Sequence, residues 1–340
     1  MSEEPAVLLR VKDLVKHFPA AGGAFSDGRA RATVHAVDGV SFSIERGRTL
    51  ALVGESGCGK TTTGRMAMGL LHPTSGQVLL ADRALPADGR QRAKQLQIIF
   101  QDPYSSLNPR MRVGTMLGEV LALHDLAADR RERNRRIGEL LEMVGLGASD
   151  AERFPHEFSG GQRQRIGVAR ALAPEPQLIV ADEPVSALDT SVQAQIINLL
   201  SDLQKRLGVA FLFIAHDLSV VRYFAHEVAV MYLGRIVETA PAEALFADPC
   251  HPYTKALLAA VPVPDPGRAR RHPPLRGETP SPVSPPSGCH FHPRCPAALP
   301  VCSSLDPPLY SVGEEHRAAC VLCDPARAPR NEQAGGGEPT

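Results

Sequence analysis

The chain has 340 residues, and its 37 basic and 37 acidic side chains give a formal net charge of zero. A protein that holds nucleic acid through many phosphate contacts is normally basic, so this balance argues against nucleic acid as a partner. The longest apolar run, about residues 209–215, is far shorter than the roughly 20 residues that a membrane-spanning helix needs. Because 43% of the residues are apolar, we expect a folded chain with a sizeable core that does not itself cross a bilayer.

The first residues do not resemble a secretory signal. Glu3 and Glu4 stand ahead of only short apolar runs, whereas such a signal has a basic start and an apolar centre. We therefore expect the chain to reside in the cytoplasm. In that compartment the seven cysteines are expected to be thiols or metal ligands rather than disulfides.

Three stretches of different character divide the chain. Short β-type runs alternate with longer helix-like segments over residues 1–249, which predicts an α/β layered domain with parallel strands. Proline and cysteine become dense over residues 250–323, so we expect a separate C-terminal extension there. Residues 324–340 are polar and contain three consecutive glycines, which predicts a disordered tail, and residues 20–33 have the composition of an exposed loop.

The first chemical motif follows an apolar strand predicted at residues 49–53. Residues 54–61 fit G-x-x-x-x-G-K-S/T, the phosphate-binding loop, whose glycines let successive backbone N–H groups point at phosphate oxygens. We expect Lys60 to reach the β- and γ-phosphates of a nucleoside triphosphate, and the hydroxyl of Thr61 to hold Mg²⁺. By itself the motif indicates only that a nucleoside triphosphate binds. The expected contacts are Gly54, Glu55, Ser56, Gly57, Cys58, Gly59, Lys60, Thr61 and Thr62.

A second glycine motif stands at the start of a predicted helix. Ser159, Gly160 and Gly161 precede a helical pattern that runs to Leu172 and is ended by Pro174. A helix that starts in this way offers an anion a hydroxyl, unpaired N–H groups and the positive end of the helix dipole. An ordinary capped helix with a basic face is the alternative interpretation of this segment taken alone.

Residues 178–183 predict a buried strand that ends in two acids. Asp182 is expected to orient Mg²⁺ and its water shell, and Glu183 to take a proton from an attacking water molecule. Two acids after a strand also occur in solvated loops. Their presence in a chain with a phosphate-binding loop favours the catalytic interpretation.

The next helix and strand have clear local signals. Thr190 followed by Gln193 predicts a capping box at a helix start, and Gly208 is placed to end the helix. Residues 209–214 are apolar on both faces, which predicts a strand in the middle of a parallel sheet. Functional groups are expected just past the carboxyl end of such a strand, where His216 stands.

Taken together, these motifs resemble the ABC ATPase family. The resemblance rests on residues 158–165, F-S-G-G-Q-R-Q-R, together with the phosphate-binding loop and the two acids. The family signature is usually Leu-Ser-Gly-Gly-Gln, and this chain has Phe158 in the first place. The resemblance covers about residues 8–249. It implies an α/β P-loop NTPase fold, with a RecA-like core, an antiparallel β subdomain, a helical subdomain at about residues 103–173, and a small Cys/Pro-rich C-terminal extension.

Further positions match the family one at a time. Gln101, after a strand predicted at residues 96–100, matches the glutamine implied to sense the γ-phosphate through Mg²⁺ and to face a transmembrane partner. His216 matches the histidine implied to contact the γ-phosphate, Asp189 ends the family's D-loop, and Phe18 matches the aromatic residue that stacks on adenine. The implied catalytic residues are Glu183, His216 and Gln101, and the implied Mg²⁺ ligands are Thr61, Gln101 and Asp182.

The resemblance also implies partners. Ser159, Gly160, Gly161 and Gln162 would complete the nucleotide site of an opposite subunit, identical or different, so that two ATPase domains enclose two ATP molecules. ATP binding would close this dimer and hydrolysis to ADP and phosphate would reopen it. Two transmembrane permease subunits, supplied by an extracytoplasmic solute-binding protein, would be driven by this chain from the cytoplasmic side of the membrane.

The C-terminal extension narrows the resemblance. Residues 251–258, H-P-Y-T-K-A-L-L, and residues 288–296, G-C-H-F-H-P-R-C-P, look like the extension of oligopeptide and dipeptide importer ATPases. That subfamily implies uptake of di- and oligopeptides, nickel complexes or some sugars. The chain looks most like the second of the two different ATPase subunits that often pair in such importers.

Five cysteines lie within residues 289–323, a segment with few periodic apolar residues that a metal centre would stabilise. In some members of the subfamily a four-iron four-sulfur cluster is implied at this place. A zinc ribbon fits poorly, because only Cys320 and Cys323 form a C-x-x-C pair. Unliganded thiols are the alternative. The expected cluster ligands are Cys289, Cys295, Cys302 and Cys320.

Rival functions share some of these motifs. An ABC ATPase that acts on nucleic acid would share the nucleotide motifs, but normally carries long coiled coils, zinc-finger insertions or a second ATPase domain. A small GTPase or a kinase would lack the Ser-Gly-Gly-Gln segment. We therefore predict an ATP-hydrolysing subunit of a membrane importer.

Overall fold

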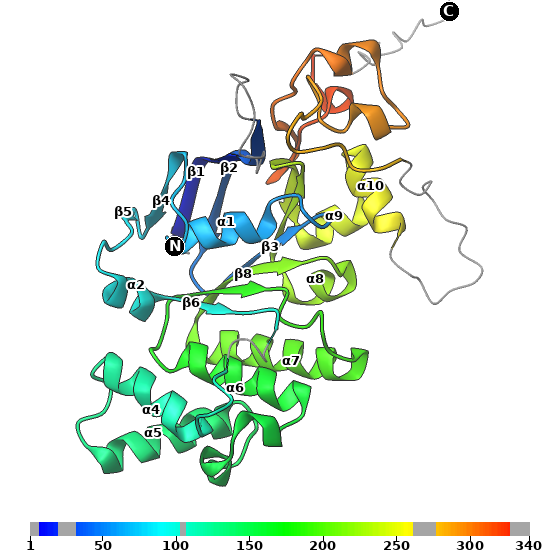
Figure 1. Cartoon of the computed structure of the whole chain (residues 1–340). Helices are drawn as coiled ribbons and strands as arrows, with labels where there is room; N and C mark the ends of the chain where they lie inside the picture. Colours follow the sequence, from blue (N-terminus) through cyan, green and yellow to red (C-terminus); the bar gives the residue numbers. More distant parts are fainter. Residues whose placement is uncertain (1–6, 20–31, 103–106, 261–276, 327–340) are drawn as a thin grey trace, which may run out of the picture.

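Two β-sheets organise the chain in the computed structural model, which describes residues 7–19, 32–102, 107–260 and 277–326. The larger sheet has the strand order β11-β12-β10-β9-β3-β8-β7-β6, and the smaller one the order β2-β1-β4-β5. Figure 1 shows helices α4, α5 and α6 in the lower half of the view, away from residues 277–326 at the top. Residues 20–31 of the loop expected at residues 20–33, and residues 327–340 of the tail expected at residues 324–340, lie outside the described residues. Thr33, the last residue of the expected loop, is instead the first residue of a strand.

The centre of the larger sheet is parallel and buried. Its parallel strands are β6 (Leu96–Ile99), β7 (Leu178–Asp182), β8 (Ala210–Ala215), β3 (Thr49–Val53) and β9 (Glu227–Tyr232). All six residues of β8 are buried, as expected for a strand covered on both faces, although β8 begins one residue later than predicted. Pairing aligns Val53 with Ala215 and Asp182 with Ile214, so the carboxyl ends of three strands meet at one edge.

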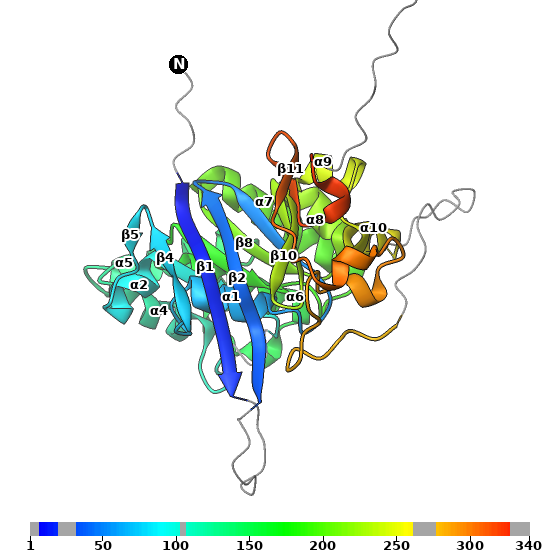
Figure 2. The same cartoon turned by 90° about the horizontal axis from the view of Figure 1, so that it is seen from above.

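The smaller sheet is antiparallel. It contains β1 (Val7–Pro19), β2 (Thr33–Glu45), β4 (Ser75–Leu80) and β5 (Arg83–Ala84). Figure 2 shows the long strands β1 and β2 side by side across the molecule. Leu9 and Leu14 of β1 belong to the same apolar cluster as Leu50 and Leu52 of β3, so this sheet packs on the parallel core. Sequence periodicity alone did not separate this sheet from the parallel strands.

Helices cover the core and build one end of the molecule. Leu117 of α4 and Leu141 of α5 are fully buried in the same apolar cluster as Ile166 of α6 and Phe211 of β8. The end formed by α4, α5 and α6 is therefore continuous with the main core. The helices are α1 (Lys60–Ala67), α2 (Gly89–Gln95), α4 (Val113–Leu123), α5 (Arg130–Met143), α6 (Gly160–Leu172), α7 (Thr190–Leu207), α8 (Leu218–Phe224), α9 (Ala242–Ala247) and α10 (Pro252–Ala259).

Helix α7 covers the predicted residues but is capped differently at its start. Its N-cap residue is Asp189, without a side-chain cap bond, so the predicted capping box of Thr190 and Gln193 is wrong. The amide of Gln193 instead donates to the carbonyl oxygens of Val185 and Leu188, at 3.0 and 2.9 Å, because the preceding loop folds back over the helix. Gly208 ends the helix in a left-handed conformation, as predicted.

The C-terminal region extends the larger sheet. Strand β12 (His316–Ala318) pairs antiparallel with β10 (Arg235–Pro241), and β11 (Tyr310–Gly313) pairs with β12. The fully buried carboxylate of Glu238 accepts hydrogen bonds from the backbone N–H groups of Cys250 and His251, at 2.7 and 2.9 Å, and is 2.8 Å from the imidazole of His316. These contacts tie the region to the core, although its sequence shows little periodicity. Among the described helices, none is both long and apolar enough to span a membrane.

Candidate nucleotide-binding site

The phosphate-binding loop joins β3 to α1. Gly59 is the N-cap of α1 with φ near 104°, and a Cβ atom there would lie 2.2 Å from the carbonyl oxygen of Ala36. Glycine is therefore required at this position by both backbone conformation and space. The ammonium of Lys60, a residue that is 5% exposed, donates to the carbonyl oxygens of Gly54 and Glu55 at 2.8 and 2.9 Å. The loop thus forms a compact turn around Lys60 at the positive end of a helix.

Thr61 and Asp182 meet at the edge of the sheet where the parallel strands end. The hydroxyl of Thr61 donates to a carboxylate oxygen of Asp182 at 2.9 Å. Burial raises the pKa of Asp182, and the negative charge of Glu183 adds to the rise. A hydroxyl and a carboxylate are the hard oxygen ligands that Mg²⁺ prefers. A cation bound here would also relieve the repulsion between the carboxylates of Asp182 and Glu183. The side chains present therefore fit a magnesium ion.

Glu183 lies between two polar side chains from other loops. Its Oε2 atom accepts a hydrogen bond from the amide of Gln101 at 3.2 Å and is 3.1 Å from the Nδ1 atom of His216. The backbone of Glu183 is left-handed, with φ near 47°, and its N–H group donates to the carbonyl oxygen of Ile214 in β8. Strand pairing thus brings together an acid, an amide and an imidazole from three separate segments.

The remaining predicted contacts lie in three places. Phe18 is half-buried near the end of β1, with the ammonium of Lys16 5.1 Å from its ring centroid. Ser56 and Gly57 are exposed, Cys58 is buried, and Thr62 lies in the first turn of α1. Asp189 is the exposed N-cap of α7.

The serine–glycine segment begins α6. The hydroxyl of Ser159 accepts from the N–H group of Gln162 at 3.3 Å, while the Gln162 side chain accepts from the N–H group of Ser159 at 3.0 Å. A Cβ atom on Gly161 would lie 2.5 Å from Val192, so glycine lets α6 approach α7 closely. The side chains of Ser159 and Gln162 thus each accept from the backbone N–H group of the other residue. They make no contact with Thr61, Asp182 or Glu183 among the hydrogen bonds of the described residues.

Four cysteines of the C-terminal region line one small cavity. Cys289, Cys295, Cys302 and Cys320 face it, and Cys323 does not line it. Burial raises the pKa of Cys289 to about 11, and the neighbouring cysteines Cys320, Cys302 and Cys295 oppose its ionisation further. A cationic metal centre favours the ionised form of thiols that share one cavity and oppose one another's ionisation, so these residues fit the expected cluster.

The spacing of the four sulfur atoms can be compared with the spacing that a single zinc ion imposes. Tetrahedral zinc, with Zn–S bonds of about 2.3 Å, would hold its four sulfur atoms about 3.8 Å apart. Among the described residues, the groups whose ligand atoms all lie within 4.8 Å are His17 with His35 and Asp38, and Glu238 with Cys250 and His316. The four cysteines are not one of these groups, so their spacing is wider than a single zinc ion requires.

Three neighbours of the phosphate-binding loop were not predicted as site residues from the sequence. Arg294 and Thr279 contact the carboxylate of Glu55, and the hydroxyl of Tyr253 accepts from the Glu55 backbone N–H group at 2.9 Å. They stand about 200 residues or more from Glu55, beyond the reach of any local pattern. The packing of Tyr253 and Phe291 against Tyr232, at the end of β9, brings this region to the loop.

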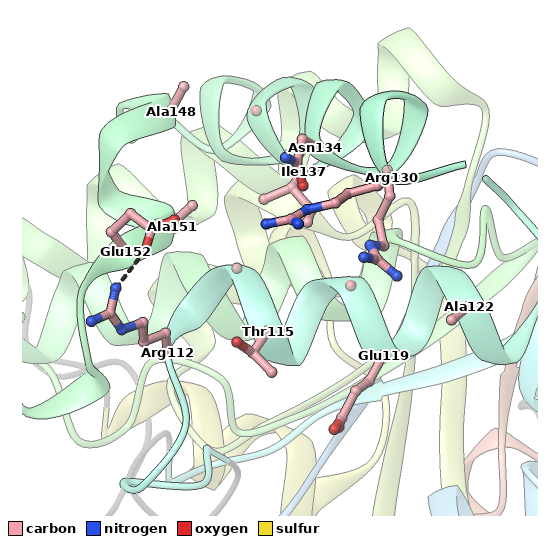
Figure 3. A pocket seen from close by; sticks show the side chains of 14 residues that line it. Arg112, Thr115, Glu119, Ala122, Arg130, Asn134, Ile137, Ala148, Ala151 and Glu152 are labelled. Carbon is pink, nitrogen blue, oxygen red and sulfur yellow. Dashed lines mark hydrogen bonds and ion pairs between the residues drawn. The ribbon is translucent and has the colours of Figure 1, made fainter. Parts of the chain in front are cut away.

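A separate hollow lies between α4 and α5, as Figure 3 shows. Its volume is about 580 Å³, and Arg112 and Glu152 form an ion pair at its rim. Arg130, Asn134 and Thr115 also line it, and none of the predicted site residues does. The residues predicted for phosphate and Mg²⁺ instead gather at the carboxyl edge of the parallel strands.

Comparison with known families gives two matches. Residues 37–186 match the family described as ABC transporter, and residues 237–302 match the oligopeptide/dipeptide transporter C-terminal region. A probable peptide ABC transporter ATP-binding protein of Sinorhizobium fredii is 53% identical over 94% of this chain and 91% of its own length. A putative oligopeptide transport ATP-binding protein of Bacillus subtilis is 50% identical over 93% of this chain and 95% of its own length.

Solved structures give the same fold. A subunit of the cbiONQ ABC transporter complex of Clostridium perfringens superposes with a TM-score of 0.61, at 26% identity, over 72% of this chain and 92% of that chain. A dimeric ATP-binding cassette bound to ADP and phosphate gives a TM-score of 0.58, at 27% identity, over 69% of this chain and 99% of that chain. The P-loop fold predicted from the sequence is therefore confirmed. This chain belongs to the ATP-binding proteins of ABC transporters, in the group that carries the oligopeptide/dipeptide transporter C-terminal region.

Proposed function

We propose that this chain is the ATP-hydrolysing subunit that drives uptake of di- or oligopeptides, or of a related solute, through a membrane ABC importer. The observation that carries the proposal is the meeting of Lys60, Thr61, Asp182, Glu183 and His216 at one edge of the parallel sheet. The substrate class rests on the names of relatives that are about half identical over nearly the whole chain. An ABC ATPase acting on nucleic acid is not favoured, because those relatives are named for peptide transport.

Each group at this edge has a chemical role in the proposal. Lys60 leaves its loop carbonyls to bind the β- and γ-phosphates. Thr61, Asp182 and Gln101 would hold Mg²⁺, which would neutralise phosphate charge. Glu183 accepts the proton of the attacking water. Gln101 and His216 hold the carboxylate of Glu183 in place and face the γ-phosphate. Phe18 stacks on adenine, and the loop residues Gly54–Gly59 with Thr62 surround the phosphates.

The second half of each nucleotide site comes from another subunit. Ser159, Gly160, Gly161 and Gln162 present a capped helix start that suits an anion, and Asp189 lies beside the next helix start. A related cassette forms a dimer with bound ADP and phosphate, which supports a dimer here as well. The partner subunit is either a copy of this chain or a different ATPase.

The assembly in which the chain acts follows from the same membership. We infer two transmembrane permease subunits and an extracytoplasmic solute-binding protein as further partners, with this chain bound peripherally on the cytoplasmic side.

We divide the chain into an ATPase domain at residues 1–249, with a helical part at about residues 103–173, an extension at residues 250–323 and a tail at residues 324–340.

The cysteine cavity is the proposed site of a four-iron four-sulfur cluster. Cys289, Cys295, Cys302 and Cys320 would be its ligands, which is supported by their shared cavity and by a sulfur spacing wider than a single zinc ion needs. Protein purified without oxygen should then contain about four iron atoms and four sulfides per chain. Iron-free protein that holds zinc, or no metal, would contradict the cluster.

The catalytic assignment is tested with Glu183→Gln. The variant keeps the shape of the side chain but lacks the base, so we expect kcat for ATP to fall by about 10²–10⁴-fold while ATP still binds. Glu175→Gln is the matched control, because Glu175 also has a left-handed backbone, with φ near 58°, and pairs with Arg136 on the surface. Near-parental ATP turnover by Glu183→Gln would remove Glu183 from the base role.

The substrate class is tested by transport. In a host whose own copy of the gene is disrupted, the parent chain should restore uptake of labelled di- and oligopeptides, and the Glu183→Gln variant should not. Nickel and sugar uptake are measured in the same cells. Peptide uptake that is unchanged by the disruption, together with loss of another solute, would redirect the substrate assignment and leave the ATPase assignment intact.

A further inference from the structure

The phosphate-binding loop contains an acidic side chain, and the C-terminal region neutralises it. Glu55 is the second residue of the loop, directly after Gly54. Arg294 makes two hydrogen bonds to its carboxylate, at 2.8 Å to Oε2 and 3.1 Å to Oε1. The hydroxyl of Thr279 donates to Oε2 as well, at 2.8 Å. A two-pronged guanidinium–carboxylate pair fixes the direction of the carboxylate as well as its charge.

The ion pair is shielded from solvent on the arginine side. The side chain of Arg294 is 7% exposed, and that of Glu55 is 23% exposed. Burial alone would raise the pKa of Glu55, but the hydrogen bonds from Arg294 and Thr279 and the positive charge of Arg294 outweigh it, and the pKa lies below its ordinary value. The carboxylate is therefore charged at neutral pH. Removal of Arg294 would take away its hydrogen-bonded counterion and leave Lys60 as the nearby positive charge.

The backbone of Glu55 is held from both sides. Its N–H group donates to the hydroxyl of Tyr253 at 2.9 Å, and its carbonyl oxygen accepts from the ammonium of Lys60 at 2.9 Å. Tyr253 is fully buried in α10, where its ring lies 4.7 Å from that of Tyr232. Glu55 is thus anchored to the core through Tyr253 of α10.

Arg294 itself is presented by a short, well-packed turn. Its N–H group donates to the carbonyl oxygen of Phe291 at 3.0 Å, and Phe291 is almost fully buried against the rings of Tyr232 and Tyr253. Cys289 and Cys295, which line the cysteine cavity, flank this turn. The position of Arg294 therefore depends on how the C-terminal region packs, and the loop conformation depends on Arg294.

From this arrangement we propose that Arg294 is a positioning residue of the nucleotide site, which neutralises Glu55 and turns it away from the incoming triphosphate. The proposal rests on the proposed role of residues 54–61 as the ATP phosphate loop. ATP carries several negative charges into this loop, and an unpaired carboxylate one residue after Gly54 would repel them. Residues 277–295 are then part of the ATP-binding machinery, although they follow the ABC ATPase motifs in the sequence.

The test uses the full chain and three variants. Arg294→Gln removes the charge and leaves a shorter polar side chain with two N–H donors, so we expect the Kd and KM for MgATP to rise about tenfold with little change in kcat. The double variant Arg294→Gln with Glu55→Gln removes both charges and should return the Kd to within about threefold of the parent. Arg317→Ala, an exposed arginine of β12 that does not contact the loop, is the control and should bind ATP like the parent.

Each result has one interpretation. Parental ATP affinity in Arg294→Gln overturns the proposal, and so does a double variant as weak as the single one, because Arg294 would then only hold the C-terminal region in place. Should Arg294→Gln fail to fold, the double variant decides, because it carries neither charge. A folded double variant within about threefold of the parental Kd supports charge neutralisation, whereas tenfold weaker binding contradicts it. A parent chain that binds no ATP would contradict the nucleotide site itself rather than the role of Arg294.

Discussion

Single residues decide whether the phosphate-binding loop can form. Lys60 is buried against its own loop carbonyls, and this compact turn requires glycine where the backbone is left-handed and space is limited. Gly59 meets both conditions. Gly57 meets only the first, since its φ is near 79° and a Cβ atom there would have no neighbour within 4 Å. Substitution of Gly59 therefore tests the effect of a steric clash, and substitution of Gly57 tests the effect of the left-handed backbone alone.

Gly59→Ala should abolish ATP binding, because the new Cβ atom would lie 2.2 Å from the backbone oxygen of Ala36. Gly57→Ala should incur only the left-handed backbone strain, about 1–2 kcal/mol, and keep ATP affinity within about tenfold. Titration with a fluorescent ATP analogue measures both variants, and circular dichroism checks that they fold. Equal affinities in the two variants would mean that contact with Ala36 does not constrain the loop.

Two helices are stabilised at their first turn by a capping side chain. Ser159 caps α6 by accepting from the N–H group three residues on, and Asp129 caps α5 in the same way, with its carboxylate 2.8 Å from the N–H group of Glu132. The two caps are chemically similar. Only the α6 cap is proposed to face a nucleotide in another subunit.

We expect Ser159→Ala and Asp129→Ala each to lower the free energy of unfolding by about 1 kcal/mol, the usual cost of losing an N-cap. Only Ser159→Ala should also lower the ATP turnover of the assembled dimer. Urea unfolding measures the first effect and a phosphate-release assay the second. If both variants kept parental turnover, the α6 start would have a structural role alone.

The whole molecule is joined where the C-terminal region meets the core. His251 is the N-cap of α10, and its Nδ1 atom accepts from the N–H group of Tyr253 at 3.1 Å. Burial lowers the pKa of His251 to about 3, so this imidazole stays neutral in the folded chain at pH values where it is protonated in the unfolded chain. The stability that neutral His251 contributes to the fold is therefore fully present above the ordinary histidine pKa, and it falls as the pH drops below that value.

The pH dependence gives a prediction for the whole fold. One proton taken up only on unfolding costs about 1.4 kcal/mol per pH unit, so the free energy of unfolding should fall less steeply between pH 6 and 5 in His251→Asn. Asparagine still caps the helix but does not titrate. Urea unfolding at both pH values measures the slope, with the exposed His72→Asn as control. Identical slopes in the parent and His251→Asn would show that His251 does not account for acid sensitivity.

The sequence by itself determined the nucleotide motifs and the fold family. The phosphate-binding loop, the strand before Asp182 and the helix that starts at Ser159 each depend on residues close together in the chain, so local patterns were sufficient to predict them. The predicted cap of α7 failed because Gln193 bonds to Val185 and Leu188, which lie in a loop folded back onto the helix. Local pattern could not anticipate that fold-back.

Tertiary structure decided which distant residues meet. Strand order places Glu183 beside Gln101 and His216, and the addition of β12 to β10 brings the C-terminal region to the core, which no periodicity indicated. The contact of Arg294 with Glu55 joins residues 239 positions apart. Such a pair depends on the packing of whole elements rather than on neighbouring residues, which is why the sequence predicted Glu55 in the nucleotide site but not the arginine that neutralises it.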